Sequence, residues 1–237
     1  MKALILAAGL GSRLAPITNN IPKSLVPVNG KPIIFKQIEN LKNNGITDIT
    51  IVSGYKGNIL KERVRDLYPN INIIESVDYA STNNMYSAYL AKNYLKNSDF
   101  LMMNADVFYD NSVIAALLKF NSPNAIVTDI GNYLDESMKV VERDGRLVKI
   151  SKDIKECEAL GSSIDVYKFS SSGGSAFFKK CSEYIEVKKE IKLWSEVALN
   201  DVLSEVEFKP CPLVGRWLEI DNHEDLASAE KLFSENK

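Results

Sequence analysis

Patterns typical of buried strands and of amphipathic helices alternate through the first half of the chain. Short apolar runs predict strands, and segments with apolar residues three or four positions apart predict helices. The predicted order is strand, helix, strand, helix, strand, helix and strand, over residues 3–7, 31–44, 48–53, 56–68, 71–76, 84–95 and 100–103. This alternation is typical of an α/β fold, here an open, doubly wound, mainly parallel sheet with helices on both faces.

The pattern is less regular beyond residue 110. Apolar arms at 140–142 and 147–150 flank Asp144-Gly145, which predicts a small antiparallel hairpin inserted into the fold. Further elements are predicted as a strand at 164–169, helices at 175–186 and 195–204, a strand at 217–220 and a helix at 224–233. No repeat or linker interrupts the chain, so we expect one domain.

Composition excludes several classes of protein. The 237 residues are 45% hydrophobic and 25% charged, as in ordinary globular proteins. A net charge of −2 gives no strong field for nucleic acid, and no run approaches the roughly 20 apolar residues of a membrane helix. The first apolar run stops at Gly9 without a cleavage site, so no secretion leader is expected. Three cysteines and the single His223 share no zinc-ligand spacing, which favours a reducing cytoplasm.

The stretch at residues 6–34 includes roughly twenty residues without regular period, between the first predicted strand and the first predicted helix. Gly9 and Gly11 allow the backbone to approach a ligand closely, and backbone N–H groups there can bind phosphate. Arg13 and Lys23 supply the positive charge that a triphosphate requires. On the glycines alone, a plain turn with two solvated cations is an equal alternative. His223 is expected to be a surface residue rather than an acid–base group.

Two acids follow predicted strands and could bind a divalent metal. Asp106 comes just after the strand at 100–103, and Asp221 ends the segment WLEID. Carboxylate oxygens at the ends of strands suit Mg²⁺. The alternatives are an Asx turn for Asp106 and, for Asp221, a capping box that pairs it with Glu224.

Residues 6–28, LAAGLGSRLAPITNNIPKSLVPV, resemble the signature of the sugar-phosphate nucleotidyltransferase superfamily. The resemblance implies a Rossmann-like nucleotidyltransferase domain over residues 1–237. It implies that Arg13 and Lys23 are catalytic and that Asp106 and Asp221 bind Mg²⁺. It also implies a nucleotide-binding loop that consists of Leu6, Ala7, Ala8, Gly9, Gly11 and Ser12. Asn104 stands where many relatives carry Asp, which puts a second tightly held metal in doubt.

The segment Asn83-Asn84-Met85-Tyr86-Ser87 resembles a motif of cytidylyltransferases that act on phosphocholine or phosphoglutamine. The resemblance favours CTP and implies that Asn83, Ser87 and Asn104 contact the nucleotide. Helix capping is an equal explanation for the asparagines, and the same polar groups could serve thymine or uracil.

The predicted acceptor-binding residues lie in the second half of the chain: Glu158, Gly161, Ser162, Trp194 and Glu196, with Ser163, Asp165, Asn200 and Asp201 as neighbouring candidates. Trp194 with Glu196 could form part of a cage for a quaternary ammonium group. A core position is the usual explanation for such a tryptophan.

The sequence therefore predicts a cytoplasmic, Mg²⁺-dependent transfer of CMP from CTP to a small phosphorylated acceptor, phosphocholine-like or phosphoglutamine-like. The resemblance implies a role in modifying surface polysaccharide. No protein base is required, because a phosphate monoester is already largely a dianion at pH 7. Expected partners exclude nucleic acid and membrane, and a homodimer is left open. The alternatives are a hexose-1-phosphate uridylyl- or thymidylyltransferase and a catalytically silent nucleotide-binding regulator.

Overall fold

A central sheet organises the computed structural model, which describes residues 1–134 and 136–234. Within these residues the sheet has nine strands, and seven of them follow the order β10-β9-β11-β6-β1-β4-β5, while β8 pairs with β11 and β12 pairs with β8. Their bounds are β1 Lys2–Ala7, β4 Ile49–Ser53, β5 Asn72–Glu75, β6 Phe100–Asn104, β8 Ala125–Ile130, β9 Lys139–Arg143, β10 Arg146–Ser151, β11 Gly161–Phe169 and β12 Lys209–Pro212.

The centre of the sheet is parallel. Strand β1 pairs in parallel with β4 on one side and β6 on the other, and β4 pairs in parallel with β5. Strand β11 then runs antiparallel to β6 and carries the antiparallel hairpin β9–β10 beyond it. The predicted α/β fold class is confirmed, and the hairpin around Asp144-Gly145 forms where the sequence predicted it.

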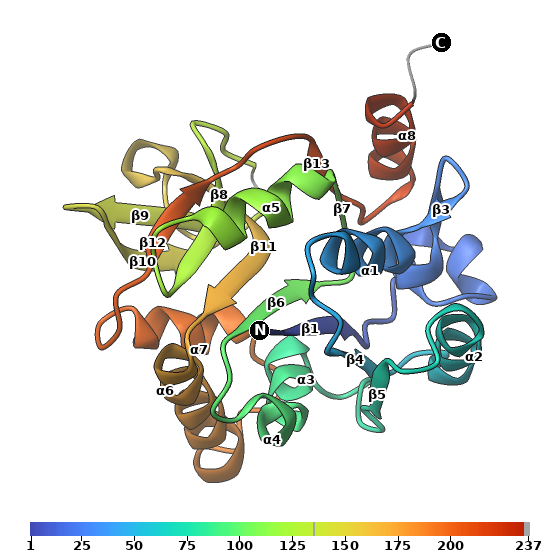
Figure 1. Ribbon diagram of the computed structural model, residues 1–237, viewed down its shortest axis with the longest axis horizontal. Helices are drawn as coiled ribbons and strands as arrows, with labels where there is room; N and C mark the ends of the chain where they lie inside the picture. The colour runs from blue at the N-terminus through green and yellow to red at the C-terminus, as the bar shows by residue number, and fades with distance from the viewer. Residues whose placement is uncertain (135, 235–237) are drawn as a thin grey trace.

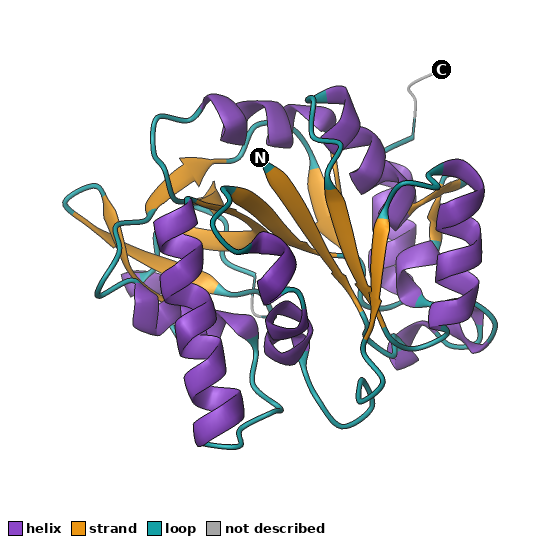
Figure 2. Ribbon diagram, turned by 60° about the horizontal axis from the view of Figure 1, so that its bottom comes forward, coloured by secondary structure: helices purple, strands orange, loops and turns teal. Residues whose placement is uncertain are grey.

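Helices cover both faces of the sheet (Figure 1 and Figure 2). One face packs against α1, α2 and α5, and the other packs against α3, α4, α6 and α7. The bounds are α1 Ile33–Asn43, α2 Gly57–Leu67, α3 Asn84–Leu90, α4 Lys92–Leu95, α5 Asn111–Lys119, α6 Ser171–Ser182 and α7 Ser195–Val202. The last helix, α8 His223–Leu232, packs instead beside the long loop after β1.

The two faces follow from the alternation of side chains along a strand. In β1, Ala3 and Ile5 belong to the core cluster under α1 and α2, whereas Leu4 and Leu6 belong to the cluster under α3 and α7. Leu4 and Ile5 are fully buried, and each such side chain contributes about 1.5–3 kcal/mol. A strand buried on both faces therefore has the continuous apolar run that the sequence displays.

Two small sheets lie outside the main one. Strand β13 (Trp217–Glu219) pairs antiparallel with β7 (Val107–Tyr109), and β2 (Pro27–Val28) pairs with β3 (Lys31–Pro32). The loop after β1 contains three short 3₁₀ turns, Ser12–Leu14, Ile17–Asn19 and Lys23–Leu25. A further 3₁₀ turn lies at Glu156–Glu158, and a π-helical segment, Glu183–Val187, extends α6.

Several elements differ from the prediction. Strands β7, β8 and β12 and helix α5 were not predicted, and the predicted helix 84–95 is interrupted at Ala91 between α3 and α4. Strand β12 contains Pro210 and Pro212, and prolines argue against a strand unless it lies at an edge. It does lie at an edge, since it pairs only with β8 among the described strands.

No helix in the described part of the chain is long and apolar enough to cross a membrane. The single domain over residues 1–237, the cytoplasmic location and the open question of a homodimer stay predictions.

Candidate active site

The loop after β1 and the turn after β6 lie side by side at one edge of the sheet. Leu6 pairs with Asn104, and the Ala105 N–H donates to the Leu6 carbonyl at 2.9 Å. Gln37 of α1 is fully buried and its amide donates to the carbonyls of Asn104 and Val107 at 2.9 and 2.8 Å. These bonds fix the turn that carries Asp106.

The pairing of β13 with β7 brings Asp221 to the same place. The Ile220 N–H donates to the Asp106 carbonyl at 2.9 Å, so two residues far apart in the sequence become neighbours. The capping box of α8 is formed by Asn222 and Asp225, one residue later than the predicted pair. That prediction was wrong, and the shift leaves the Asp221 carboxylate free to face the loop.

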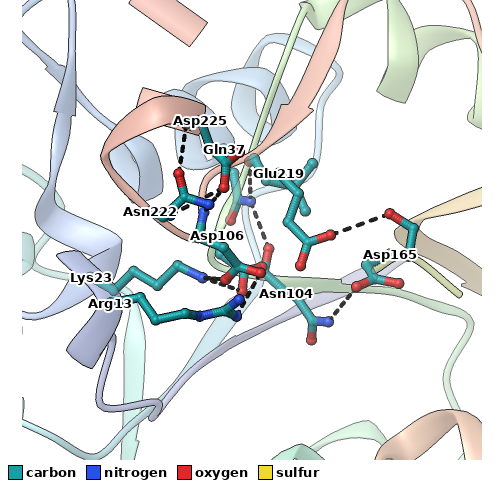
Figure 3. A network of polar contacts seen from close by, with 12 residues as sticks. Arg13, Lys23, Gln37, Asn104, Asp106, Asp165, Glu219, Asn222 and Asp225 are labelled. Carbon is teal, nitrogen blue, oxygen red and sulfur yellow. Dashed lines mark hydrogen bonds and ion pairs between the residues drawn. The ribbon is translucent and has the colours of Figure 1, made fainter. Parts of the chain in front are cut away.

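A cluster of opposite charges forms where these segments meet (Figure 3). Lys23 Nζ lies 2.8 Å from Asp106 Oδ2 and 2.5 Å from Asp221 Oδ1. The Arg13 guanidinium lies 2.7 Å from the other oxygen of Asp221. The Lys23 side chain is 13% exposed and that of Arg13 is 58% exposed, so one cation lies inside the cluster and the other at its mouth.

Three carboxylates of this cluster could hold a divalent cation. One oxygen each of Asp106, Glu219 and Asp221 lie within 4.8 Å of one another. The second oxygen of Asp106 is buried and has no hydrogen-bond partner among the described residues. A buried carboxylate oxygen without a partner costs free energy, and a hard cation would satisfy it.

Glu219 is the functional residue of this cluster that the sequence reasoning missed. The signal was present in the segment Glu219-Ile220-Asp221, because residues two positions apart in an extended chain point to the same side.

The charges shift the pKa values of the cluster in opposite directions. Burial alone would lower the pKa of Lys23, but the carboxylates of Asp106 and Asp221 raise it above its ordinary value. Burial acts against a charged Asp221, yet the ammonium of Lys23 and the guanidinium of Arg13 lower its pKa. For Glu219, burial together with the charges of Asp106, Asp165 and Asp221 outweighs the charge of Lys23 and raises the pKa to about 9.

The loop holds Lys23 in place through Gly11. Gly11 has φ 61°, and a Cβ added there would lie 2.7 Å from the Lys23 Cβ, closer than side chains can approach. The Thr18 hydroxyl donates to the Gly11 carbonyl at 2.9 Å, and the Tyr55 hydroxyl donates to the Thr18 carbonyl at 3.1 Å. Gly11 therefore positions the catalytic lysine predicted from the sequence.

An open pocket of about 250 Å³ extends from this cluster along the sheet edge. It brings together most residues that the sequence predicted for the nucleotide, the metal and the acceptor. The predicted residues that line it are Leu6, Ala8, Gly9, Arg13, Asn83, Ser87, Asn104, Asp106, Trp194, Glu196 and Asp221. Ala7 and Lys23 line a smaller adjoining pocket, whereas Gly11 and Ser12 lie at the start of the first 3₁₀ turn of the loop and line neither pocket.

Three predicted acceptor residues do not line the pocket. Glu158 is exposed in a 3₁₀ turn, and Gly161 lies in β11 directly against the Asp129 backbone. Ser162 is fully buried, where its hydroxyl donates to the Asn132 carbonyl and accepts from the Leu134 N–H. Gly161 and Ser162 therefore hold the sheet and its neighbouring loop, and Glu158 lies on the surface outside the pocket.

At the far end of the pocket lie two acids that have no lysine or arginine in hydrogen-bond contact among the described residues. The Tyr167 hydroxyl lies 2.8 Å from one oxygen of Asp165 and 2.8 Å from Glu196 Oε1, and the Ser195 hydroxyl donates to the same Glu196 oxygen at 3.0 Å. Glu196 is 3% exposed, and its second oxygen has no hydrogen-bond partner among the described residues. We call Asp165, Tyr167 and Glu196 the acidic end of the pocket.

A bulge in β11 directs Asp165 to this end. The pairing of β11 with β8 shifts between Ser163 and Tyr167, and Asp165 has φ 58°, a left-handed conformation that is uncommon outside glycine. The other Asp165 oxygen accepts from the Asn104 amide at 2.8 Å. Burial and the charge of Glu196 raise the pKa of Asp165 to about 7.

The motif at residues 83–87 serves partly as a helix cap. The Asn83 side chain accepts from the Asn84 N–H at the start of α3, and Asn84 Oδ1 accepts from the Ser195 N–H at 2.7 Å. Asn84 thus fixes the start of α7 beside the pocket. Trp194 is 44% exposed rather than a core residue, and the Lys152 Nζ lies 5.0 Å from the centre of its ring.

Comparisons with known proteins show which family the chain resembles. Residues 2–139 match the family described as nucleotidyl transferase. A choline-phosphate cytidylyltransferase of Streptococcus pneumoniae is 52% identical over 101 residues, which span 41% of this chain and 42% of that protein. A CTP:phosphoglutamine cytidylyltransferase of Campylobacter jejuni is 27% identical over 95% of this chain and 98% of its own length.

The solved structure of a CTP:phosphocholine cytidylyltransferase from Streptococcus pneumoniae has the same fold. It superimposes with a TM-score of 0.82 at 28% identity, and the match covers 98% of this chain and 99% of that protein.

Proposed function

Because the chain belongs to the nucleotidyl transferase family, we propose that it transfers CMP from CTP to a small phosphorylated acceptor and releases pyrophosphate. One observation carries this proposal: two cations of the loop, Arg13 and Lys23, meet three carboxylates at one end of the pocket. The carboxylates belong to Asp106, Glu219 and Asp221, and we call this part the phosphate end. Two relatives named for their use of CTP support the choice of nucleotide: the phosphocholine cytidylyltransferase at 28% identity and the phosphoglutamine cytidylyltransferase at 27%. Each match covers nearly the whole chain.

The reaction needs positioning and charge rather than a protein base. An oxygen of the acceptor phosphate forms a bond to the α-phosphorus of CTP, and the bond from that phosphorus to the bridging oxygen of the β-phosphate breaks. Pyrophosphate leaves with the electron pair. Arg13, which is exposed at the pocket mouth, would bind the departing phosphates, and Lys23 would bind the α-phosphate or the acceptor phosphate.

Asp106, Glu219 and Asp221 would hold the divalent cation, which we propose is Mg²⁺. The cation would supply charge neutralisation for the phosphates. All three carboxylates offer oxygen ligands, which Mg²⁺ prefers. The nearby Asn104 amide donates its hydrogen bond to Asp165 instead.

We further propose that the acceptor carries a cationic head group. Asp165 and Glu196 lie at the acidic end without a lysine or arginine in hydrogen-bond contact among the described residues, and one Glu196 oxygen lacks a partner. Buried carboxylates of this kind bind positive charge favourably. Of the two acceptor classes left open by the sequence, this favours one that resembles phosphocholine or phosphoethanolamine over phosphoglutamine.

Pyrophosphate release tests the proposal. The assay combines each of the four NTPs with phosphocholine, phosphoethanolamine, phosphoglutamine or glucose-1-phosphate, in the presence of Mg²⁺. We expect release with CTP and the two cationic acceptors. Release only with UTP or dTTP and the hexose phosphate would refute the cytidylyl assignment, and release with no pair would favour a regulator. The polysaccharide role and the cytoplasmic location stay predictions.

A further inference from the structure

The amino group of Lys23 lies between the two carboxylates at the position that a shared cation would take. Its distances to Asp106 Oδ2 and Asp221 Oδ1 are 2.8 and 2.5 Å. The side chain is almost fully enclosed, with Gly11 pressed against its Cβ. Lys23 is therefore a directional, charge-assisted partner of both proposed metal ligands.

Lys23 has two incompatible tasks in the proposed function. It neutralises Asp106 and Asp221 in the free protein, and it binds phosphate oxygens during the reaction. A metal ion on the same carboxylate oxygens would meet the ammonium at contact distance, where two positive charges repel strongly. The ammonium cannot keep both of its carboxylate contacts once those oxygens bind a metal.

We propose that Lys23 competes with the divalent cation for Asp106 and Asp221, so that metal binding releases Lys23 toward the nucleotide phosphates. The coupling is reciprocal: phosphates that bind Lys23 leave the carboxylates open to the metal, and this favours joint binding of metal and nucleotide. The inference rests on the proposed function for its nucleotide part. The competition between Lys23 and the metal does not depend on which nucleotide is used.

The remaining contacts support a release of Lys23 rather than a collapse of the site. The backbone holds both ligands without Lys23, because the Asp106 carbonyl accepts from the Ile220 N–H and the capping box of α8 begins directly after Asp221. The second Asp106 oxygen has no partner that a metal would have to displace. The ligands are thus held in place independently of Lys23.

The first test is a calorimetric titration with Mn²⁺ alone at pH 8, without nucleotide. We expect Lys23→Met to bind Mn²⁺ about 10-fold or more tightly than the wild type, because the competing charge-assisted contacts are gone. Lys31→Met is the matched control, since Lys31 is exposed and pairs with Glu39 away from the pocket. Equal affinities for the wild type and Lys23→Met would overturn the proposal.

A second measurement uses the wild-type protein and does not require the variant to fold well. Nuclear magnetic resonance of the lysine side-chain ammonium groups, with Lys23 assigned through Lys23→Arg, follows a titration with Mg²⁺. We expect the Lys23 signal to shift and to exchange faster with water as Mg²⁺ binds, while Lys31 stays unchanged. A Lys23 signal unaffected at saturating Mg²⁺ would contradict the competition.

Repeating the Mn²⁺ titration with CTP tests whether the nucleotide phosphates bind Lys23. With CTP present, the phosphates engage Lys23 in the wild type, so the advantage of Lys23→Met in Mn²⁺ affinity should disappear. If the advantage persists although CTP binds, the release of Lys23 toward phosphate is wrong. If CTP does not bind the wild type, the proposed choice of nucleotide is wrong, and the nucleotide-free titration still decides the competition.

Discussion

The two ends of the pocket carry negative charge in different ways. At the phosphate end, Asp106 and Asp221 contact Lys23, and Asp221 also contacts Arg13, so the carboxylates are held by cations of the chain itself. At the acidic end, Asp165 and Glu196 contact a phenol and hydroxyl or amide groups. The pKa of Asp221 is lowered, whereas the pKa of Asp165 is raised to about 7.

This difference indicates what each end lacks. The phosphate end can bind anions, because phosphate groups could replace Asp106 and Asp221 as the partners of Arg13 and Lys23. At the acidic end, no lysine or arginine among the described residues is in hydrogen-bond contact with Asp165 or Glu196, so a cationic ligand would complement these acids. The following predictions test this contrast, from the largest expected effect to the smallest.

Removing a carboxylate of the phosphate end should have the largest effect. We expect Asp106→Ala or Asp221→Ala to lower turnover by about 10³-fold or more, since loss of the metal costs several kcal/mol of transition-state stabilisation. Circular dichroism and thermal unfolding should show an intact fold. Near-normal activity of either variant at saturating Mg²⁺ would refute the metal assignment.

Arg13→Met should lower kcat/KM for CTP by about 10²-fold to 10³-fold, the usual cost of removing one group that stabilises charge in the transition state. Stability should change little, because the Arg13 side chain is 58% exposed. Steady-state kinetics and thermal unfolding measure the two effects. The control is Arg65→Met, an exposed change on α2 that should leave both unchanged.

Glu196→Gln tests the acidic end. We expect the KM for a cationic acceptor to rise about 10-fold, because a charge-assisted contact is lost, while the KM for CTP stays unchanged. The glutamine side chain has nearly the same size and still offers an oxygen that accepts from the Tyr167 hydroxyl. An equal rise for both substrates would show that Glu196 shapes the whole pocket rather than its acidic end.

Asp165→Asn should change how stability depends on pH. The pKa of Asp165 is raised in the folded state to about 7, from about 3.9 in an unfolded chain, so the wild type loses stability as pH rises between these values. The variant does not titrate there. Its melting temperature relative to wild type should therefore increase from pH 4.5 to pH 7.5 in metal-free buffer. A constant difference would contradict the raised pKa.

The smallest effect is expected at a pair outside the pocket. The Arg216 guanidinium donates two hydrogen bonds to the Asp110 carboxylate in a bidentate contact, each 2.9 Å long. These hydrogen bonds lower the pKa of Asp110. Asp110→Asn should reduce stability at pH 7 by less than about 1 kcal/mol, because the pair is partly exposed. The loss should shrink as pH falls below about 3.9, the pKa of an unfolded aspartate, and vanish once pH is below the lowered pKa of the folded carboxyl. Urea unfolding at pH 7 and pH 3 measures it.

The sequence predicted the parallel half of the fold well because its strands are buried on both faces. Continuous apolar runs at β1, β4 and β6 have no other simple explanation. Strand β12 could not be predicted in this way, since its prolines are tolerated only because of its position at the sheet edge. That position is a property of the assembled sheet.

The site was predictable where the sequence resembles a known signature, because residue types alone left a turn or a helix cap as equal explanations. Arg13, Lys23, Asp106 and Asp221 were named from the sequence, and the structure brings them together. The position of the α8 cap was not predictable, because residues 221 and 224 and residues 222 and 225 offer the same spacing. In the folded chain, Asn222 accepts from the Asp225 N–H, and Asp225 accepts from the N–H groups of Asp221 and Asn222.

The pairing of β13 with β7 also has a consequence for the order in which the protein is made. Asp106 emerges from the ribosome long before Glu219 and Asp221, and the last two reach it only through this pairing. A nascent chain can therefore assemble β1, β4 and β6 while it still lacks two of its three carboxylates. Chemistry that needs all three carboxylates would begin only after residue 221 has been added to the chain.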